Sequence, residues 1–269
     1  MNEINVIVAD PAGNITLFVK NNIAKCDRVS VANQLLGNPL WKAEQVGFIA
    51  EPQMGGTGRL EMMGGEFCGN AMRSFGYYLA SEQHMTKGSM QVEISGSTKL
   101  HSVDFDIEKH RAMAEMPVPM GMNSVIIPGV GILPVVEMEG ITHVIAEGES
   151  PSETFTTQVL RFFYQKQGDN RDQNHTPEAL GIMYADGLHM NPVVYVAATD
   201  SLVYENSCGS GSIAYAYYRA EDMMTGTRHE RIVQPGGVIE TTIVKEAGRV
   251  KQCLMGGPVE LSEPVTVRL

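Results

Sequence analysis

One stretch of sequence occurs twice in this chain and organises the rest of it. The first copy reads Glu66-Phe67-Cys68-Gly69-Asn70-Ala71-Met72-Arg73-Ser74-Phe75-Gly76-Tyr77-Tyr78-Leu79-Ala80, and the second reads Asn206-Ser207-Cys208-Gly209-Ser210-Gly211-Ser212-Ile213-Ala214-Tyr215-Ala216-Tyr217-Tyr218-Arg219-Ala220. Aligned without a gap, the copies share Cys-Gly, then Tyr-Tyr and then Ala, and further along Gly96 falls on Gly236. The pattern indicates an internal duplication, with one cysteine at the same structural position in each half.

Each of these cysteines is predicted to lie where a loop becomes a helix. Small or polar residues follow it, and then a run with few helix breakers that is rich in Ala, Tyr, Met and Ile. Unpaired N–H groups and the positive end of the helix dipole surround such a position. This environment lowers a thiol pKa, and the same N–H groups bind carboxylates. Two such starts facing each other would hold one carboxylate between the thiols of Cys68 and Cys208.

The composition is that of a cytoplasmic globular protein. The 269 residues allow a large core or two domains, and the net charge of −11 argues against nucleic acid and anionic membranes as partners. No stretch approaches the roughly 20 apolar residues of a membrane span, and the start of the chain does not resemble a signal peptide. Four cysteines in a chain this long do not make a disulfide framework, and none has metal-ligand spacing. We therefore expect a reducing cytoplasm and no metal.

Strand-rich halves with one long helix each favour the α+β class. Predicted helices cover residues 30–36, 68–84, 153–167 and the segment after Cys208. Predicted strands cover residues 4–8, 15–19, 44–50, 90–95, 99–105, 124–127, 132–137, 142–146, 193–197 and 238–244. Prolines and a glycine between Pro117 and Met122 mark the best boundary. The predicted domains are residues 1–117 with 258–269, and residues 118–257.

A lone cysteine is usually a small buried hydrophobe, which fits Cys26 and Cys253 because neither has a counterpart in the other half. Cys68 and Cys208 are better explained as a functional pair, with a redox disulfide as the rival interpretation. His143 stands alone in an apolar strand, and on the residues alone a core histidine is favoured over a base.

The paired motifs Cys68-Gly69-Asn70 and Cys208-Gly209-Ser210-Gly211 resemble those of the diaminopimelate epimerase superfamily. Residues 10–14, 234–237 and 257–258 occur in the family order, so the resemblance covers nearly the whole chain. The nearest branch is that of the cofactor-independent histidine racemases. Its shared phrases are found here at residues 44–49, 66–71 and 205–211.

The resemblance implies two pseudo-symmetric lobes, each a β-barrel-like sheet around a central helix, with the site in the cleft between them. It implies racemisation at an α-carbon without pyridoxal phosphate or metal, and it suggests a homodimer. One cysteine thiolate removes the α-proton, and the other cysteine delivers a proton to the opposite face. The helix starts at Gly69, Asn70, Gly209 and Ser210 would hold the substrate carboxylate, and the family has further site residues where this chain has Asn14, His143 and Asn191.

The substrate is expected to be histidine. Epimerases for diaminopimelate carry an arginine shortly before the second cysteine, whereas residues 192–207 contain no Lys or Arg. Gln45, Glu66 and Glu205 are candidates to accept hydrogen bonds from an imidazole. Arg59 could instead serve an acidic side chain, but we expect it to point outward after the Gly55–Gly58 turn. The alternatives are diaminopimelate, another basic or polar amino acid, or a non-enzymatic binding protein regulated by thiol oxidation.

Overall fold

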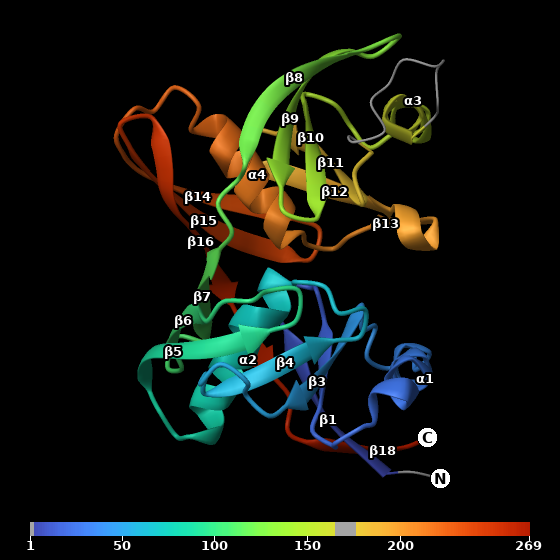
Figure 1. Cartoon of the computed structure of the whole chain (residues 1–269), viewed down its shortest axis with the longest axis vertical. Helices are drawn as coiled ribbons and strands as arrows, with labels where there is room; N and C mark the ends of the chain where they lie inside the picture. The colour runs from blue at the N-terminus through green and yellow to red at the C-terminus, as the bar shows by residue number, and fades with distance from the viewer. Residues whose placement is uncertain (1–2, 165–175) are drawn as a thin grey trace. The chain divides into compact units, whose positions relative to one another are not determined.

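The computed structural model describes residues 3–164 and 176–269 (Figure 1). The chain divides into two compact units, Met1–Glu115 with Leu254–Leu269, and Met116–Cys253. Each unit combines strands with few helices, so the α+β class predicted from the sequence is confirmed.

The first unit is built on a mixed sheet of short strands. Its elements are β1 (Glu3–Asp10), β2 (Thr16–Val19), α1 (Lys25–Leu36), β3 (Gln45–Ala50), β4 (Gly58–Met62), α2 (Gly69–Glu82), β5 (Lys87–Ile94), β6 (His101–Asp106), β7 (Arg111–Met116), β17 (Glu260–Leu261) and β18 (Val265–Arg268). The pair β1–β2 is antiparallel, β2–β3 parallel, β3–β4 antiparallel, β4–β5 parallel and β5–β6 antiparallel. Each parallel step is bridged by a helix, first α1 and then α2.

The second unit repeats this order. Its elements are β8 (Gly121–Ile127), β9 (Gly131–Met138), β10 (Ile141–Glu147), α3 (Glu153–Tyr164), β11 (Ala179–Asp186), β12 (His189–Val196), a 3₁₀ turn η2 (Ala197–Thr199), β13 (Ser201–Tyr204), α4 (Gly209–Arg219), β14 (Gly226–Gln234), β15 (Gly237–Glu246) and β16 (Arg249–Pro258), whose last residues belong to the first unit. The pair β9–β10 is antiparallel, β10–β11 parallel, β11–β12 antiparallel, β12–β14 parallel and β14–β15 antiparallel. Because the two pairing orders match, the internal duplication extends beyond the cysteine segments to the topology of both units.

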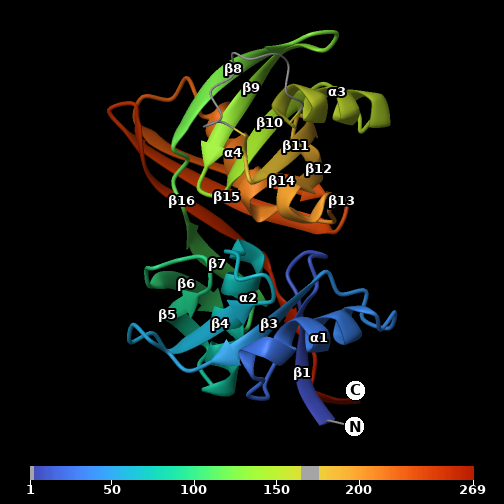
Figure 2. The same ribbon diagram turned by 45° about the vertical axis from the view of Figure 1, so that its right-hand side comes forward.

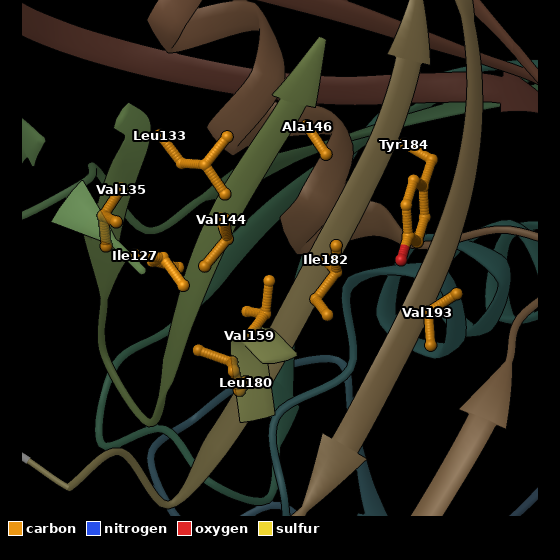
Figure 3. Close-up of a cluster of buried hydrophobic side chains, with 10 residues drawn as sticks. All are labelled: Ile127, Leu133, Val135, Val144, Ala146, Val159, Leu180, Ile182, Tyr184 and Val193. Carbon is orange, nitrogen blue, oxygen red and sulfur yellow. The ribbon is translucent and has the colours of Figure 1, made fainter. Parts of the chain in front are cut away.

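Two helices cover opposite faces of the sheet in the second unit (Figure 2). Alternate side chains of a strand point to opposite faces. Val144 of β10 and Ile182 of β11 pack with Val159 of α3 in a buried cluster (Figure 3). His143 and Gly181 each precede one of these residues along their strand, so their side of the sheet is the opposite one. That face lies against α4, which contacts β9, β10, β11 and β15.

The matching helix of the first unit is enclosed. Helix α2 contacts β1, β4, β5 and β6, and its side chains are buried on nearly every side. Burial of a helix on nearly every side places it inside the core of the unit. The one cation of this helix, Arg73, is fully buried and donates to the backbone oxygen of Pro258 at 3.0 Å and to Oδ1 of Asn70. The other helix, α1, packs Ala32 and Leu35 against β1–β3.

The helix starts at Gly69 and Gly209 are confirmed, and so are most of the predicted strands. Helix α1 begins earlier than predicted, at Lys25. Strands β4, β7, β11, β13, β14, β16 and β17 were not predicted. Polar or small residues interrupt the apolar pattern of most of them. The last residues of the helix predicted at 153–167 lie outside the described part of the chain. Within residues 3–164 and 176–269, no helix is long and apolar enough to cross a membrane.

Candidate active site

Both repeated cysteines occupy the N-cap of a buried helix. Cys68 precedes α2 with φ −132° and ψ 112°, and Cys208 precedes α4 with φ −118° and ψ 113°. An N-cap residue has extended backbone while its side chain faces the first N–H groups of the helix. Sγ of Cys68 accepts the N–H of Ala71 at 3.4 Å. The two halves therefore present a thiol at the same local position, beside the first N–H groups of a helix, where an anion is favoured.

The loop before Cys68 is held by the turn after β5. Ser95 accepts the N–H of Met62 at 2.8 Å and donates to the backbone oxygen of Glu66 at 2.9 Å. Gly96 has φ +71°, and a Cβ there would come within 2.3 Å of the Phe67 nitrogen. Only glycine permits this close approach of the turn to the cysteine loop.

One edge of the first sheet gathers three of the segments that the sequence analysis selected. Thr16 lies opposite Gln45 in the parallel pair β2–β3, and the Met63 N–H donates to Val46 where β4 ends. The start of β2, the start of β3 and the beginning of the Cys68 loop therefore lie at the same edge. Asn14, just before β2, and Gln45 share this edge.

Two buried carbonyl oxygens at this edge lack a donor. Asn14 is 2% exposed, and its Nδ2 donates to Oε2 of Glu44 at 2.6 Å, which fixes the orientation of the amide. Its Oδ1, and Oε1 of Gln45, have no hydrogen-bond partner among the described residues. Buried acceptors are normally satisfied, so the pair could accept hydrogen bonds from a ligand that carries N–H groups.

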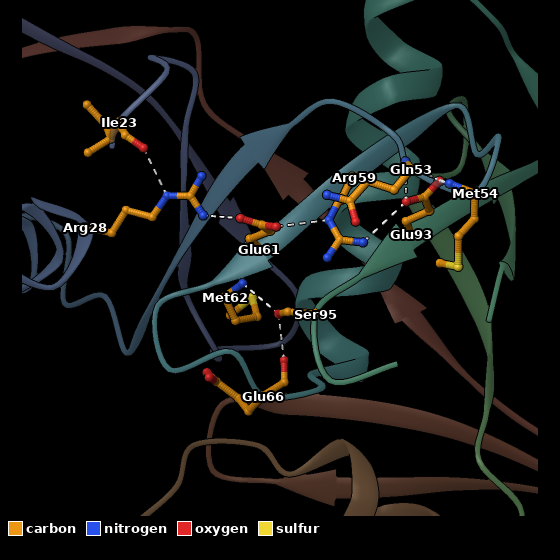
Figure 4. Close-up of polar contacts among 10 residues, drawn as sticks. All are labelled: Ile23, Arg28, Gln53, Met54, Arg59, Glu61, Met62, Glu66, Glu93 and Ser95. Carbon is orange, nitrogen blue, oxygen red and sulfur yellow. Dashed lines mark hydrogen bonds and ion pairs between the residues drawn. The ribbon is translucent and has the colours of Figure 1, made fainter. Parts of the chain in front are cut away.

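Arg59 does not point outward, so that expectation was wrong. Its side chain is 15% exposed and donates to Glu61 at 3.1 Å and to Glu93 at 3.3 Å, while Arg28 binds Glu61 from the other side (Figure 4). Because two carboxylates already neutralise it, Arg59 belongs to a structural network.

Glu93 is the fully buried end of that network and fixes the loop after β3. It accepts the backbone N–H groups of Gln53, Met54 and Gly56 as well as Arg59. Burial raises the pKa of this carboxyl, but the backbone donors and Arg59 outweigh burial and lower the pKa to about 2. Glu93 is therefore ionised at neutral pH.

In the second unit, Gln234 holds the cysteine loop. Its Oε1 accepts the N–H of Cys208 at 2.8 Å, and its Nε2 donates to Ser212 at 2.8 Å. The Gly236 N–H also donates to Asn206. Ser95 and Gln234 were not selected as site residues, although Ser95 precedes Gly96 directly and Gln234 lies two residues before the aligned Gly236.

The expectation of a lowered thiol pKa is wrong for Cys208. Burial raises the pKa of this thiol well above its usual range, and the carboxylate of Glu205 raises it further. The hydroxyl of Ser210, 3.6 Å from Sγ, acts in the opposite direction but does not overcome these effects. Cys208 is 6% exposed, and the sequence pattern could not reveal that burial outweighs the helix start.

The side chain of His143 lies beside the hydroxyl of Ser210, which in turn lies near Sγ of Cys208. It is fully buried, and its Nε2 lies 3.1 Å from Oγ of Ser210. Burial lowers the pKa of His143 to about 3, so the ring is neutral. In the residues that the structure describes, Nδ1 has no partner.

The other predicted site residues are placed as follows. Asn70 is buried in the first turn of α2, with its side-chain oxygen bound to Arg73. Asn191 is exposed on β12 opposite Tyr184. Their substrate contacts, like those of Gly69, Gly209 and Glu66, stay predictions. No group of three or more His, Cys, Asp or Glu side chains within the described ranges is arranged to hold a metal ion.

Comparison with known proteins agrees with this architecture. Residues 3–265 match the family described as "Histidine racemase CntK N-terminal domain". The chain is 32% identical over 267 residues to a histidine racemase of Fusobacterium nucleatum, covering 96% of this chain and 94% of that protein. It is 28% identical over 247 residues to a histidine racemase of Staphylococcus aureus, covering 87% and 86%.

Among solved structures, a hydroxyproline epimerase from Agrobacterium vitis superposes with a TM-score of 0.66 over 98% of this chain and 92% of that one. At 9% identity this similarity concerns the fold alone. The family match and the full-length relative carry the assignment: this chain belongs to the histidine racemase family.

Proposed function

We propose that the protein interconverts L- and D-histidine, with Cys68 and Cys208 as its two acid–base groups. The observation that carries this proposal is the duplicated N-cap cysteine, which has nearly the same backbone angles in both units. Inverting an α-carbon requires removal of a proton from one face and delivery to the other, which needs two acid–base groups. A duplicated fold with one thiol per half supplies both.

The protonation of Cys208 supports an order for the two proposed roles. Because the pKa of Cys208 is raised, this residue is a thiol in the free enzyme. Cys68, whose Sγ accepts a helix N–H, is the residue we propose as the base, which takes the α-proton and becomes a thiol. Cys208 gives its proton to the opposite face and becomes a thiolate. For the other enantiomer the two roles are exchanged.

The negative charge that develops on the substrate carboxylate needs fixed donors. The N–H groups at the starts of α2 and α4 are such donors, since they are already oriented before the reaction. A helix dipole alone contributes only about 0.3–1 kcal/mol at an exposed site and up to about 2 kcal/mol when partly buried. We propose that the aligned N–H groups contribute most of the stabilisation.

Histidine as the substrate rests on the relatives and on two features of this chain. Residues 192–207 contain no Lys or Arg that would bind a second carboxylate. The unpartnered oxygens of Asn14 and Gln45 accept hydrogen bonds, which suits the ammonium or imidazole N–H groups of histidine. A substrate that lacks these donors would leave both buried acceptors unsatisfied.

The test is a deuterium wash-in screen of the common L-amino acids and diaminopimelate, with chiral separation of the products. We expect exchange and inversion with histidine. Exchange with diaminopimelate and none with histidine would contradict the substrate. No exchange with any amino acid would favour the thiol-regulated binding protein instead.

The role of the acceptors can be tested separately. Gln45→Ala should raise KM for histidine, since it removes a buried acceptor, whereas Gln45→Glu keeps an oxygen in place and should retain more affinity. Gln91→Ala is the matched control because Gln91 is exposed on β5. Equal KM values for Gln45→Ala and Gln91→Ala would exclude the proposed contact.

A further inference from the structure

We infer that the buried imidazole of His143 is a positioning group that makes the Ser210 hydroxyl a hydrogen-bond donor to Cys208. The inference rests on the proposed function for its catalytic meaning, but its geometry lies wholly within the second unit. The resemblance implied His143 and Ser210 as substrate contacts. In the structure they form one chain of polar contacts that ends at Sγ of Cys208.

The distances define the chain. Nε2 of His143 lies 3.1 Å from Oγ of Ser210, and that oxygen lies 3.6 Å from Sγ of Cys208. His143 comes from β10, whereas Ser210 and Cys208 lie at the start of α4. The hydroxyl of Ser210 can accept from one neighbour and donate to the other, so the proton on the histidine decides its direction.

The surroundings of the ring decide which nitrogen carries that proton. Gly181 lies directly opposite His143 in the parallel pair β10–β11, and a Cβ on Gly181 would come within 2.2 Å of Nδ1. Nδ1 thus rests against bare glycine backbone and has no partner among the described residues. A buried N–H without an acceptor is rarer and costlier than an unsatisfied lone pair. The proton therefore resides on Nε2.

A proton on Nε2 of His143 also affects the thiol of Cys208. With Nε2–H donating to Oγ, Ser210 has its own proton free for Sγ of Cys208 and cannot turn it toward the ring. A hydroxyl that donates to sulfur stabilises the thiolate relative to the thiol. It opposes burial and Glu205, the charged group that faces this thiol. Without that donor, a smaller fraction of Cys208 would be thiolate in the direction of reaction in which Cys208 must act as the base.

Full burial also keeps His143 out of the proton transfers. A second proton would place a charge in the core, and the pKa of about 3 shows how strongly that is disfavoured. Among residues 3–164 and 176–269, no charged side chain contributes to this shift, and burial is its single cause. His143 therefore orients Ser210 at every working pH, rather than receiving a proton through it.

The direct test is the tautomer, read from long-range ¹H–¹⁵N NMR of the imidazole nitrogens in the intact protein. We expect neutral His143 with its proton on Nε2, unchanged between about pH 5 and 8. A proton on Nδ1, or titration of the ring within this range, would overturn the inference. This measurement needs neither substitution nor racemase activity, so it is independent of the proposed function.

A second test follows the thiol. The pH midpoint for iodoacetamide alkylation of Cys208, located by peptide mass spectrometry, should rise by about one unit in Ser210→Ala, which is roughly a tenfold loss of thiolate below the midpoint. His143→Phe should cause a similar rise, and the double variant should add nothing further. His143→Gln keeps a side-chain N–H donor and should restore part of the shift.

The control is His229→Phe, since His229 bonds the hydroxyl of Thr242 instead. Its midpoint should equal that of the unmodified protein. Additive shifts in the double variant, or no shift in His143→Phe, would show that the two residues do not act through one chain.

Discussion

At the residue scale, the two cysteines share a backbone position but not an environment. Cys68 is half-buried and accepts a helix N–H, whereas Cys208 is buried beside Glu205 and Ser210. A racemase must work in both directions, but its two thiols need not be equivalent at rest. Under the proposed function, the raised pKa of Cys208 makes it the acid in the free enzyme, and Cys68 is the residue proposed as the base.

Replacing either Cys68 or Cys208 by alanine should lower racemisation by roughly 10²–10⁴-fold or more, since each removes one acid–base group. Serine should leave a trace of activity, because an alcohol is a far weaker acid and base. Initial rates by chiral chromatography measure both effects. Cys26→Ala is the control, since Cys26 is exposed and has no counterpart in the repeat. Near-full activity in one alanine variant would contradict the two-base assignment.

Glu93 gives the protein an acid-sensitive contact. Its folded-state pKa of about 2 lies below the ordinary value of 4.5, so its contribution is fully present above about pH 4.5 and is lost as the pH falls toward 2. Glu93→Ala should destabilise the fold by about 3–5 kcal/mol, because it leaves three backbone N–H groups without their acceptor and removes one of the two carboxylates that bind Arg59. Urea unfolding measures this loss. Glu108→Gln, an exposed carboxylate, is the control. A loss no larger than that of the control would exclude the role given to Glu93.

At the element scale, each cysteine loop is held by residues at the end of the strand that follows the cysteine's helix, which is β5 in the first unit and β14 in the second. Ser95 and Gly96 hold the first loop, and Gln234 and Gly236 hold the second. The side chain that binds the loop is a hydroxyl in the first unit and an amide in the second. In both units it lies at the end of the corresponding strand. The thiols are thus positioned by the sheet as well as by their own helices.

Gly96→Ala should reduce both stability and racemase activity, because a Cβ would collide with the Phe67 backbone. Gly65→Ala separates this clash from backbone strain, since Gly65 has φ +78° but open space around it. We expect about 1–2 kcal/mol of destabilisation from strain in Gly65→Ala and a larger loss in Gly96→Ala. Thermal unfolding and kcat are the measurements. Equal losses in the two variants would show that the close approach is unimportant.

At the scale of the whole molecule, the duplication could be predicted from the sequence, whereas the surroundings of individual side chains could not. Identical residues at Cys68 and Cys208 revealed the repeat, and small residues after each revealed the helix starts. The burial of Cys208, the ion pairs of Arg59 and the contact of His143 with Ser210 depend on strands far apart in the chain. Local patterns do not encode such packing, so the pKa of Cys208 and the direction of Arg59 were predicted wrongly.

The central claim, that two thiols racemise histidine from opposite faces, is tested most directly by early-time isotope analysis in D₂O. Starting from L-histidine, each D-histidine product should carry deuterium at Cα, because the thiol that delivers the new hydrogen has exchanged with D₂O. The remaining L-histidine should still carry protium, and the reverse reaction should show the same pattern. Product that retains protium, or substrate that gains deuterium as fast as product forms, would contradict two separate acid–base groups.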